Sequence, residues 1–335
     1  MKTALYWNKL EEQKVHCYLC PHNCKIKEGK RGICGVRKNI NGSLVAETYG
    51  EICSAGFDPI EKKPLYHFYP GWNIFSVGSI GCNLHCKFCQ NWEISQTTPD
   101  EFDYLRSYTP EELVSIALGH SNNAGIAYTY NEPTVWFEFM FDIARLAKEK
   151  NLKNVMVSNG FINPEPLEKS FEVMDAYSID LKSFNNNFYK KLTSSSLEPI
   201  KENLKRIKKR GKHLEITNLV ITGENDNAEE FENMLKWIAG ELGSDTVLHI
   251  SRYYPTYKLH NPPTSPETLE KFYRIARKYL DYPYLGNMHS DRGHITHCPK
   301  CGSLVISRRH YRAELEKIDE KGRCKHCGEQ IVVLS

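Results

Sequence analysis

The stretch Cys82-Asn83-Leu84-His85-Cys86-Lys87-Phe88-Cys89 carries three cysteines in C-x3-C-x2-C spacing, directly after an apolar run. Three thiolates this close on one loop can hold three corners of a 4Fe-4S cluster and leave one iron open to another ligand. Clusters that only transfer electrons take four Cys, and structural zinc also takes four ligands. The set of three therefore predicts a reaction site. The alternative is half of a zinc site, completed by His85 or a distant Cys.

The composition is that of a globular protein with metal sites. The chain has 335 residues, and its 44 Lys and Arg against 41 Asp and Glu give a net charge of +3. This mixed charge does not by itself argue for nucleic-acid or membrane binding. We find no signal pattern and no apolar stretch of about 20 residues, so we expect a cytoplasmic protein without a membrane partner. The 12 Cys fall into groups that suit metals better than disulfides.

The N-terminal segment contains a second set of cysteines. Cys17, Cys20, Cys24 and Cys34 could close a four-thiolate site. Zinc is the simpler occupant and the favoured prediction, and an auxiliary 4Fe-4S cluster is the alternative. Cys53 lies outside the set and is interpreted as a small buried thiol.

The C-terminal segment contains two C-x2-C pairs, Cys298-Pro299-Lys300-Cys301 and Cys324-Lys325-His326-Cys327. A glycine follows each pair, as expected where knuckle turns need backbone freedom. The spacing predicts a zinc ribbon with short strands at Leu304–Ile306 and Ile331–Val333. A rubredoxin-like iron site has the same spacing and is the alternative.

The middle of the chain alternates between apolar runs and amphipathic stretches. The apolar or β-branched runs are predicted strands, and they are Ile74–Ile80, Ile126–Tyr130, Val155–Val157, Tyr177–Leu181, Leu214–Ile221, Val247–Ile250 and Tyr282–Leu285. Helix starts are indicated at Thr109-Pro110, Asn163-Pro164 and Ser265-Pro266, and a helix over Lys201–Arg210 should end at Gly211. Repeated strand–helix units imply parallel strands joined by right-handed crossovers. The prediction is an α/β fold with an incomplete (β/α)6-7 barrel over 71–290, a Cys-rich segment over 1–70 and a zinc-ribbon-like domain over 291–335.

Polar residues follow the predicted strands, where the active sites of such barrels lie. Asn131-Glu132-Pro133 follows the second strand, Ser158-Asn159-Gly160 the third, and Asp180-Leu181-Lys182 closes the fourth. A carboxylate offers only acceptors and suits a cationic amine, so Glu132 is a candidate ligand for one. The alternative is a Glu at a helix N-terminus, stabilised by the helix dipole. Arg252 ends the sixth strand and is a candidate for cofactor or substrate contact.

The cysteine loop, with Phe88 before its third Cys, resembles the signature of the radical S-adenosylmethionine (SAM) enzymes. In that family the amino and carboxylate groups of SAM chelate the open iron. The segment Thr129-Tyr130-Asn131-Glu132-Pro133 is similar in place to the family's Gly-Gly-Glu motif, with Tyr130 and Asn131 at the two glycines. This resemblance implies that Phe88, Asn131 and Glu132 bind the cofactor.

Two further segments are similar in position to parts of the glycyl-radical-enzyme activases. In those proteins the third and fourth strand ends contact SAM or a nearby monovalent cation. The resemblance implies that Ser158, Asn159, Asp180 and Lys182 contribute to cofactor binding, with Lys182 paired to the SAM carboxylate.

The order of motifs along nearly the whole chain, including Asp58-Pro59-Ile60-Glu61-Lys62-Lys63-Pro64-Leu65, resembles the AmmeMemoRadiSam system radical SAM enzymes, which are relatives of pyruvate formate-lyase activating enzyme. This resemblance implies Memo-like and AMMECR1-like partner proteins. It also implies a low-potential electron donor of the flavodoxin or ferredoxin type.

The predicted cofactors are therefore a 4Fe-4S cluster, SAM and Zn2+, and the predicted reaction is reductive cleavage of SAM. The resulting 5′-deoxyadenosyl radical abstracts hydrogen from a substrate, which is a polypeptide if the protein follows the activases. The alternatives are modification of RNA or a small molecule, or an iron–sulfur electron-transfer or scaffold protein without SAM chemistry. RNA contact would use a basic stripe at Arg308, Arg309 and Arg312, but neighbouring Asp and Glu residues disfavour it.

Overall fold

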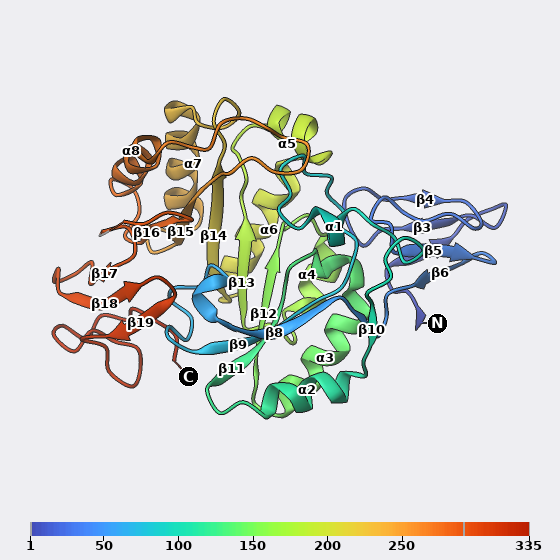
Figure 1. Ribbon diagram of the computed structural model, residues 1–335, viewed down its shortest axis with the longest axis horizontal. Helices are drawn as coiled ribbons and strands as arrows, with labels where there is room; N and C mark the ends of the chain where they lie inside the picture. The colour runs from blue at the N-terminus through green and yellow to red at the C-terminus, as the bar shows by residue number, and fades with distance from the viewer. Residues whose placement is uncertain (1, 291, 335) are drawn as a thin grey trace.

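The computed structural model describes residues 2–290 and 292–334, and a large, mostly parallel sheet lies at its centre (Figure 1). In these residues the sheet has eight strands in the order β16-β15-β14-β13-β12-β11-β9-β8. The strands are β8 Ser54–Pro59, β9 Asn73–Gly78, β11 Asn123–Tyr128, β12 Lys153–Ser158, β13 Ala176–Asp180, β14 His213–Val220, β15 Val247–Arg252 and β16 Pro283–Gly286. Neighbours from β9 to β16 pair in parallel, whereas β8 pairs antiparallel with β9.

The parallel strands coincide with the predicted apolar runs, so this part of the prediction is confirmed. Their residues are almost continuously buried, as expected for a parallel sheet with helices over it. The edge strand β8 was not predicted, because its exposure alternates and it contains Gly56 and Pro59, which weaken a strand signal. This strand lies within the predicted N-terminal segment but belongs to the main sheet. The domain boundaries and the partial barrel stay predictions.

Helices connect most of the parallel strands, as predicted. They are α1 Trp92–Ser95, α2 Pro110–Leu118, α3 Phe137–Glu149, α4 Pro164–Ser170, α5 Asn186–Thr193, α6 Glu198–Lys209, α7 Ala228–Glu241 and α8 Pro266–Ala276, with 3-10 turns η1 Ile60–Lys62 and η2 Pro133–Trp136. The capping box at Thr109 and Glu112 is formed, and Ser265 caps α8. Asn163 precedes α4 without capping it, because its amide donates to the Tyr18 and Cys20 carbonyls instead.

The N-terminal segment forms small antiparallel sheets beside the main sheet. One has the order β1-β6-β5 and the other β2-β3-β4. The strands are β1 Lys2–Thr3, β2 Trp7–Lys9, β3 Val15–Cys17, β4 Lys25–Ile26, β5 Arg37–Ile40 and β6 Ser43–Ala46, and a separate pair joins β7 Glu51–Ile52 to β10 Arg106–Ser107. Buried Val15, Ile26 and Val36 belong to the same apolar core as strands of the main sheet.

The C-terminal segment is a three-stranded antiparallel sheet with its own apolar cluster. Its strands are β17 Thr296–His297, β18 Leu304–Arg309 and β19 Arg312–Leu315. The predicted strand at Leu304–Ile306 is present. The one at Ile331–Val333 is wrong, because only Val333 forms a bridge, with Phe68 of the N-terminal segment. Figure 1 shows the two outer segments on opposite sides of the main sheet.

Buried polar side chains join the C-terminal segment to the main sheet and to the segment before it. Arg308 donates to the carbonyl of Tyr66 at 2.6 Å and lies over the Tyr66 ring. The ring nitrogens of His67 reach the Ile331 carbonyl and the Tyr284 hydroxyl, each at 2.7 Å. Because Arg308 is buried in this contact, the predicted basic stripe of Arg308, Arg309 and Arg312 does not form one surface, which weakens the RNA alternative.

Candidate functional site

The three cysteines of the C-x3-C-x2-C stretch lie on the loop that leaves the carboxyl end of β9. Cys86 is buried, and Cys82 and Cys89 are partly buried. Burial raises the pKa of all three thiols, to about 12 at Cys86, where nearby Lys182 opposes the shift. Buried thiols become thiolates when a cation compensates the charge, so this donor set fits a thiolate-bound cluster.

His85 does not complete a zinc site with these thiols. Its Nδ1 is hydrogen-bonded to the Gln96 side chain at 2.5 Å, at an exposed position. This contact favours the three-thiol interpretation of the loop.

Asn131 holds the backbone that leads into the cysteine loop. Its Oδ1 accepts from the Ser79 amide at 3.1 Å, and its Nδ2 donates to the Gly81 carbonyl at 2.9 Å. Gly81 has φ of +81°, and a Cβ there would lie 2.6 Å from the Cys34 carbonyl oxygen, so only glycine fits. The structure therefore gives Asn131 a positioning role, while its predicted contact with SAM stays a prediction.

Glu132 is 2% exposed and accepts hydrogen bonds from two neighbouring strand ends. Its Oε1 accepts from the Thr134 amide and hydroxyl and from the Ser158 hydroxyl, at 2.6 to 3.0 Å. Its Oε2 accepts from the Asn159 amide at 2.9 Å. Burial raises the pKa of Glu132, although the hydrogen bonds from these donors oppose the shift. Glu132 also caps η2, so the alternative interpretation as a helix-start Glu describes part of its role.

Tyr130 occupies the place of a motif glycine with φ of +71°, a left-handed conformation that glycine adopts more easily. Its hydroxyl donates to Asp58 at 2.7 Å, and the Lys63 ammonium lies 4.5 Å from its ring centre. Lys63 also bonds Asp58 at 2.8 Å. Burial raises the pKa of Asp58, but the contacts with Lys63 and Tyr130 outweigh burial and hold this pKa well below its usual range. The segment 58–65 therefore fixes the turn before Glu132, a role that sequence reasoning missed.

Asn159 connects the end of β12 to the cysteine loop. Its Nδ2 lies 2.9 Å from Asn83 Oδ1 and 3.7 Å from Cys82 Sγ. Asn83 is fully buried and donates in turn to the Phe161 carbonyl. Sequence reasoning also missed Asn83, although an amide between two cluster cysteines was a usable signal.

Asp180 and Lys182, at the end of β13, form an ion pair of 2.8 Å beside the loop. The Lys182 ammonium lies 5.9 Å from the Phe88 ring centre. Burial opposes the charge on Lys182, but Asp180 and Cys86 outweigh it and raise the pKa of Lys182. A permanent cation therefore lies close to the predicted cluster ligands.

Arg252 contacts the loop that follows β15. Its Nε donates to the Thr264 carbonyl at 2.7 Å, and its guanidinium lies over the Tyr254 ring. The same loop reaches the cysteine loop, because the Lys258 amide donates to the Lys87 carbonyl at 2.8 Å. Arg252 thus orders a loop beside the site, and direct contact with cofactor or substrate stays a prediction.

The two sets of four cysteines differ in geometry. The sulfurs of Cys298, Cys301, Cys324 and Cys327 all lie within 4.8 Å of one another, so this group could bind a metal ion. The N-terminal cysteines line one small cavity instead. Cys53 belongs to neither set, and its thiol donates to the Ser79 carbonyl at 2.8 Å.

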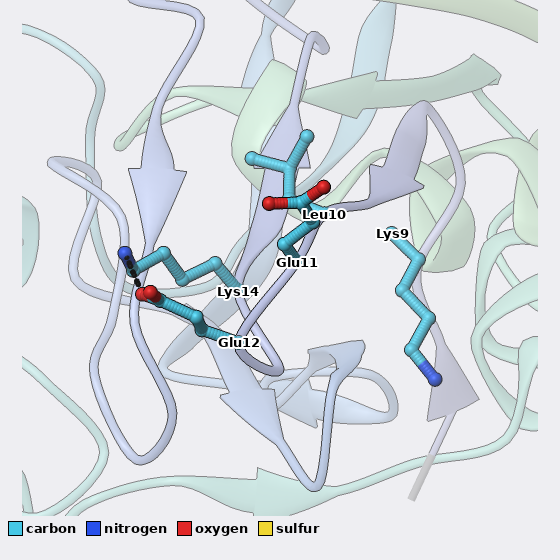
Figure 2. A pocket seen from close by; sticks show the side chains of 5 residues that line it. All are labelled: Lys9, Leu10, Glu11, Glu12 and Lys14. Atoms are coloured by element: carbon cyan, nitrogen blue, oxygen red, sulfur yellow. Dashed lines mark hydrogen bonds and ion pairs between the residues drawn. The ribbon is translucent and has the colours of Figure 1, made fainter.

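A surface pocket of about 640 Å3 lies at the β2–β3 turn, away from these groups (Figure 2). Figure 2 shows Lys9, Leu10 and Glu11 along it, with Glu12 paired to Lys14. Lys9, Glu11 and Glu12 are exposed, Leu10 and Lys14 are half-buried, and together they give no chemical reason for a site. Within residues 2–290 and 292–334, no helix is long and apolar enough to cross a bilayer.

Comparisons with known proteins agree with this geometry. The sequence model of the radical SAM superfamily matches residues 77–238, which contain the cysteine loop, Glu132, Asn159 and Lys182. An uncharacterized protein of Methanocaldococcus jannaschii is 47% identical over the full length of both chains. The pyruvate formate-lyase-activating enzyme of Listeria monocytogenes is 25% identical over 49% of this chain and 68% of its own.

Among solved structures, a radical SAM methyltransferase from Sphaerobacter thermophilus shares the fold. Its TM-score is 0.51 at 18% identity, over 68% of this chain and 69% of that chain. The cysteine loop, the parallel sheet and these likenesses place the chain in one family. It belongs to the radical SAM superfamily and is related to the pyruvate formate-lyase activating enzymes.

Proposed function

We propose that this protein cleaves SAM reductively at a 4Fe-4S cluster held by Cys82, Cys86 and Cys89, and acts on a polypeptide. One observation carries the proposal. The carboxylate of Glu132, the amide of Asn159 and the ammonium of Lys182, from three neighbouring strand ends, lie beside one loop that carries one buried and two partly buried thiols. When bound, the reduced cluster gives one electron to SAM, releasing methionine and a 5′-deoxyadenosyl radical that abstracts hydrogen from the substrate.

We propose that different residues around the loop bind different groups of SAM. Oε1 of Glu132 accepts three hydrogen bonds, whereas Oε2 accepts one, so Oε2 has room for the SAM ammonium. The cation of Lys182 suits the SAM carboxylate. Asn159 donates toward Cys82 sulfur and orders Asn83, which steadies the loop. Burial of these groups excludes water from the site.

The polypeptide substrate is supported by the relatives, which include activating enzymes. We propose a low-potential electron donor of the flavodoxin or ferredoxin type for the same reason. Memo-like and AMMECR1-like partners are part of the proposal through the order of motifs alone. Zinc is proposed for the C-terminal group, because its sulfur pairs at 3.4 and 3.7 Å suit a tetrahedral ion with bonds of about 2.3 Å.

The decisive experiment measures 5′-deoxyadenosine after adding SAM and a strong reductant to anaerobically purified protein. The wild type forms it, and Cys86→Ala reduces it to the level of a protein-free blank, because one corner of the cluster loses its thiolate. Cys53→Ser is the matched control, since Cys53 lies near the loop but in neither cysteine set. Equal product from wild type and Cys86→Ala, with cluster content verified by iron and sulfide, would contradict the proposal.

A further inference from the structure

The N-terminal cysteines stand too far apart for the ion that their number suggests. A tetrahedral zinc with Zn–S bonds of about 2.3 Å needs sulfurs about 3.8 Å apart. The C-terminal set meets this spacing, and among the described residues it is the only group of three or more metal-ligating side chains with all ligand atoms within 4.8 Å. Cys17, Cys20, Cys24 and Cys34 therefore do not gather at zinc spacing.

A cavity explains why these sulfurs are separated. Its volume is about 20 Å3, and its lining includes Cys17, Cys20, Cys24, Cys34 and Arg37. A 4Fe-4S cluster places each thiolate on a separate corner of a larger core, which fits thiols arranged around a void.

Hydrogen-bond donors already point to an anionic group there. The backbone amides of His22, Ile33 and Val36 lie close to the sulfurs of Cys20, Cys24 and Cys34, respectively, and favour their thiolate forms. Arg37 is 1% exposed, and its Nε has no hydrogen-bond partner in the described residues, although the other two guanidinium nitrogens are bonded. An unpartnered buried N–H is costly, and thiolate or sulfide at the cavity would accept from it.

This cavity lies next to the proposed SAM site, because residues that line it also contact residues of that site. Thr134 lines it, and the same Thr134 donates to Glu132. The Cys34 carbonyl is packed against Gly81, next to Cys82. The His22 Nε2 is hydrogen-bonded to the Asn83 carbonyl at 2.7 Å, between two cysteines of the loop.

We infer that Cys17, Cys20, Cys24 and Cys34 hold a second 4Fe-4S cluster and not zinc. With thiolates at all four corners, this cluster has no open iron for SAM and serves electron transfer. One electron enters from a low-potential donor of the flavodoxin or ferredoxin type and one leaves toward the Cys82 loop, with no bond made or broken. This direction of transfer rests on the proposed function, whereas the metal content does not.

The test removes the cluster ligands of the Cys82 loop and measures the iron, sulfide and zinc that remain bound. The full chain with Cys82→Ala, Cys86→Ala and Cys89→Ala is purified anaerobically from iron-supplemented cells and assayed for iron, acid-labile sulfide and zinc. We expect about four iron and about four sulfide per chain, with about one zinc at the C-terminal group. The reduced protein should show an electron paramagnetic resonance signal that SAM does not change, because the cluster is closed.

Two further variants make the test specific. Cys20→Ala with Cys34→Ala in the wild type should lower iron from about eight to about four per chain, and it answers the question if the triple variant does not fold. Cys53→Ser should leave iron and sulfide unchanged. A folded triple variant with two zinc per chain, or with iron but no sulfide, would overturn the inference. Two clusters without 5′-deoxyadenosine would instead contradict the proposed function alone.

Discussion

The two outer segments of the molecule each carry four cysteines, but the sulfur atoms are arranged differently in the two. In the C-terminal segment the sulfurs converge, and Cys298 and Cys324 are packed in a small apolar cluster of their own. In the N-terminal segment the sulfurs surround a cavity, and Cys17 belongs to the large core shared with the main sheet. The segments lie on opposite sides of the main sheet (Figure 1). Equal numbers of thiols therefore do not imply equal metal groups or equal roles.

A buried arginine attaches each outer segment to the rest of the molecule, and the two arginines differ in their partners. Arg37 pairs with Glu138 of α3 at 2.9 Å, and both side chains are 2% exposed. Arg308 bonds the Tyr66 carbonyl and the Thr296 hydroxyl. The N-terminal arginine is thus part of an ion pair beside the cavity that the four cysteines line, whereas the C-terminal one mainly fixes a docking contact.

The largest expected effect comes from removing the C-terminal metal. Structural zinc contributes on the order of 10 kcal/mol to the folding of small domains, and the cluster around Cys298 is too small to replace it. A strong chelator should therefore unfold Leu304–Arg309 and Arg312–Leu315 while the strands of the main sheet stay folded. Hydrogen exchange measured by mass spectrometry should become at least about a hundredfold faster in those two strands.

Cys301→Ser without chelator is the matched control and should reproduce the same exchange pattern. Equal acceleration in Val15–Cys17 and Arg37–Ile40 would break the comparison, since it would show that both segments depend on the same exchangeable ion. Unchanged exchange in both strands of the ribbon would show that the C-terminal segment folds without metal.

The next effect separates the two arginines. Arg37→Met leaves the buried Glu138 carboxylate without its partner, which costs about 3–5 kcal/mol of unfolding free energy. Arg308→Met loses hydrogen bonds from a charged donor and should cost about 1.5–3 kcal/mol. Urea denaturation followed by circular dichroism measures both.

The double variant Arg37→Met with Glu138→Met tests what else Arg37 does. It removes both charges and should recover most of the stability. If Arg37 also donates to the N-terminal group, the stable double variant should still have a shifted reduction potential at that group. An unchanged potential would limit Arg37 to the ion pair.

Local signals in the sequence were sufficient to predict the parallel strands and the starts of several helices. The parallel strands are buried on both faces and so appear as continuous apolar runs, and caps such as Thr109 and Ser265 mark helix starts with their own side chains. The strand at Ser54–Pro59 lacked such a pattern because it lies at the sheet edge. The spacing of its three cysteines was likewise sufficient to predict the cysteine loop.

The supports of the site could not be predicted, because they join distant parts of the chain. Tyr130 holds a glycine-like conformation only through Asp58 and Lys63, which are more than 60 residues away. The interpretation of the N-terminal cysteines as a zinc site rested on their number, whereas the cavity depends on how Arg37 and Thr134 meet in the fold. Such contacts are set by tertiary packing and leave no periodic pattern.

The smallest expected effect concerns the attachment of the C-terminal segment by His67. The Ile331 carbonyl can only accept, so His67 Nδ1 carries the proton and Nε2 accepts from the Tyr284 hydroxyl. A second proton on Nε2 would reverse this hydrogen bond, so that the Tyr284 hydroxyl accepts from Nε2 and no longer donates to it. Burial lowers the pKa of His67 to about 3, although the neighbouring Glu215 carboxylate opposes this shift.

The unfolded chain therefore binds a proton at His67 below pH about 6.5, while the folded protein does not until pH about 3. The contribution of His67 to stability is fully present above pH 6.5 and declines by up to about 1.4 kcal/mol per pH unit below it. Urea midpoints at pH 7.5, 6.5 and 5.5 measure this slope, and His67→Gln should make it smaller. His22 and His294, whose pKa values burial also lowers, keep the remainder. Glu215 stays ionised over this range, because His213 and His249 outweigh the burial that raises its pKa, so it adds no slope of its own. If His67→Gln kept the wild-type slope, the acid sensitivity would arise from these other histidines or from the metal groups, and the docking contact would not distinguish the two segments.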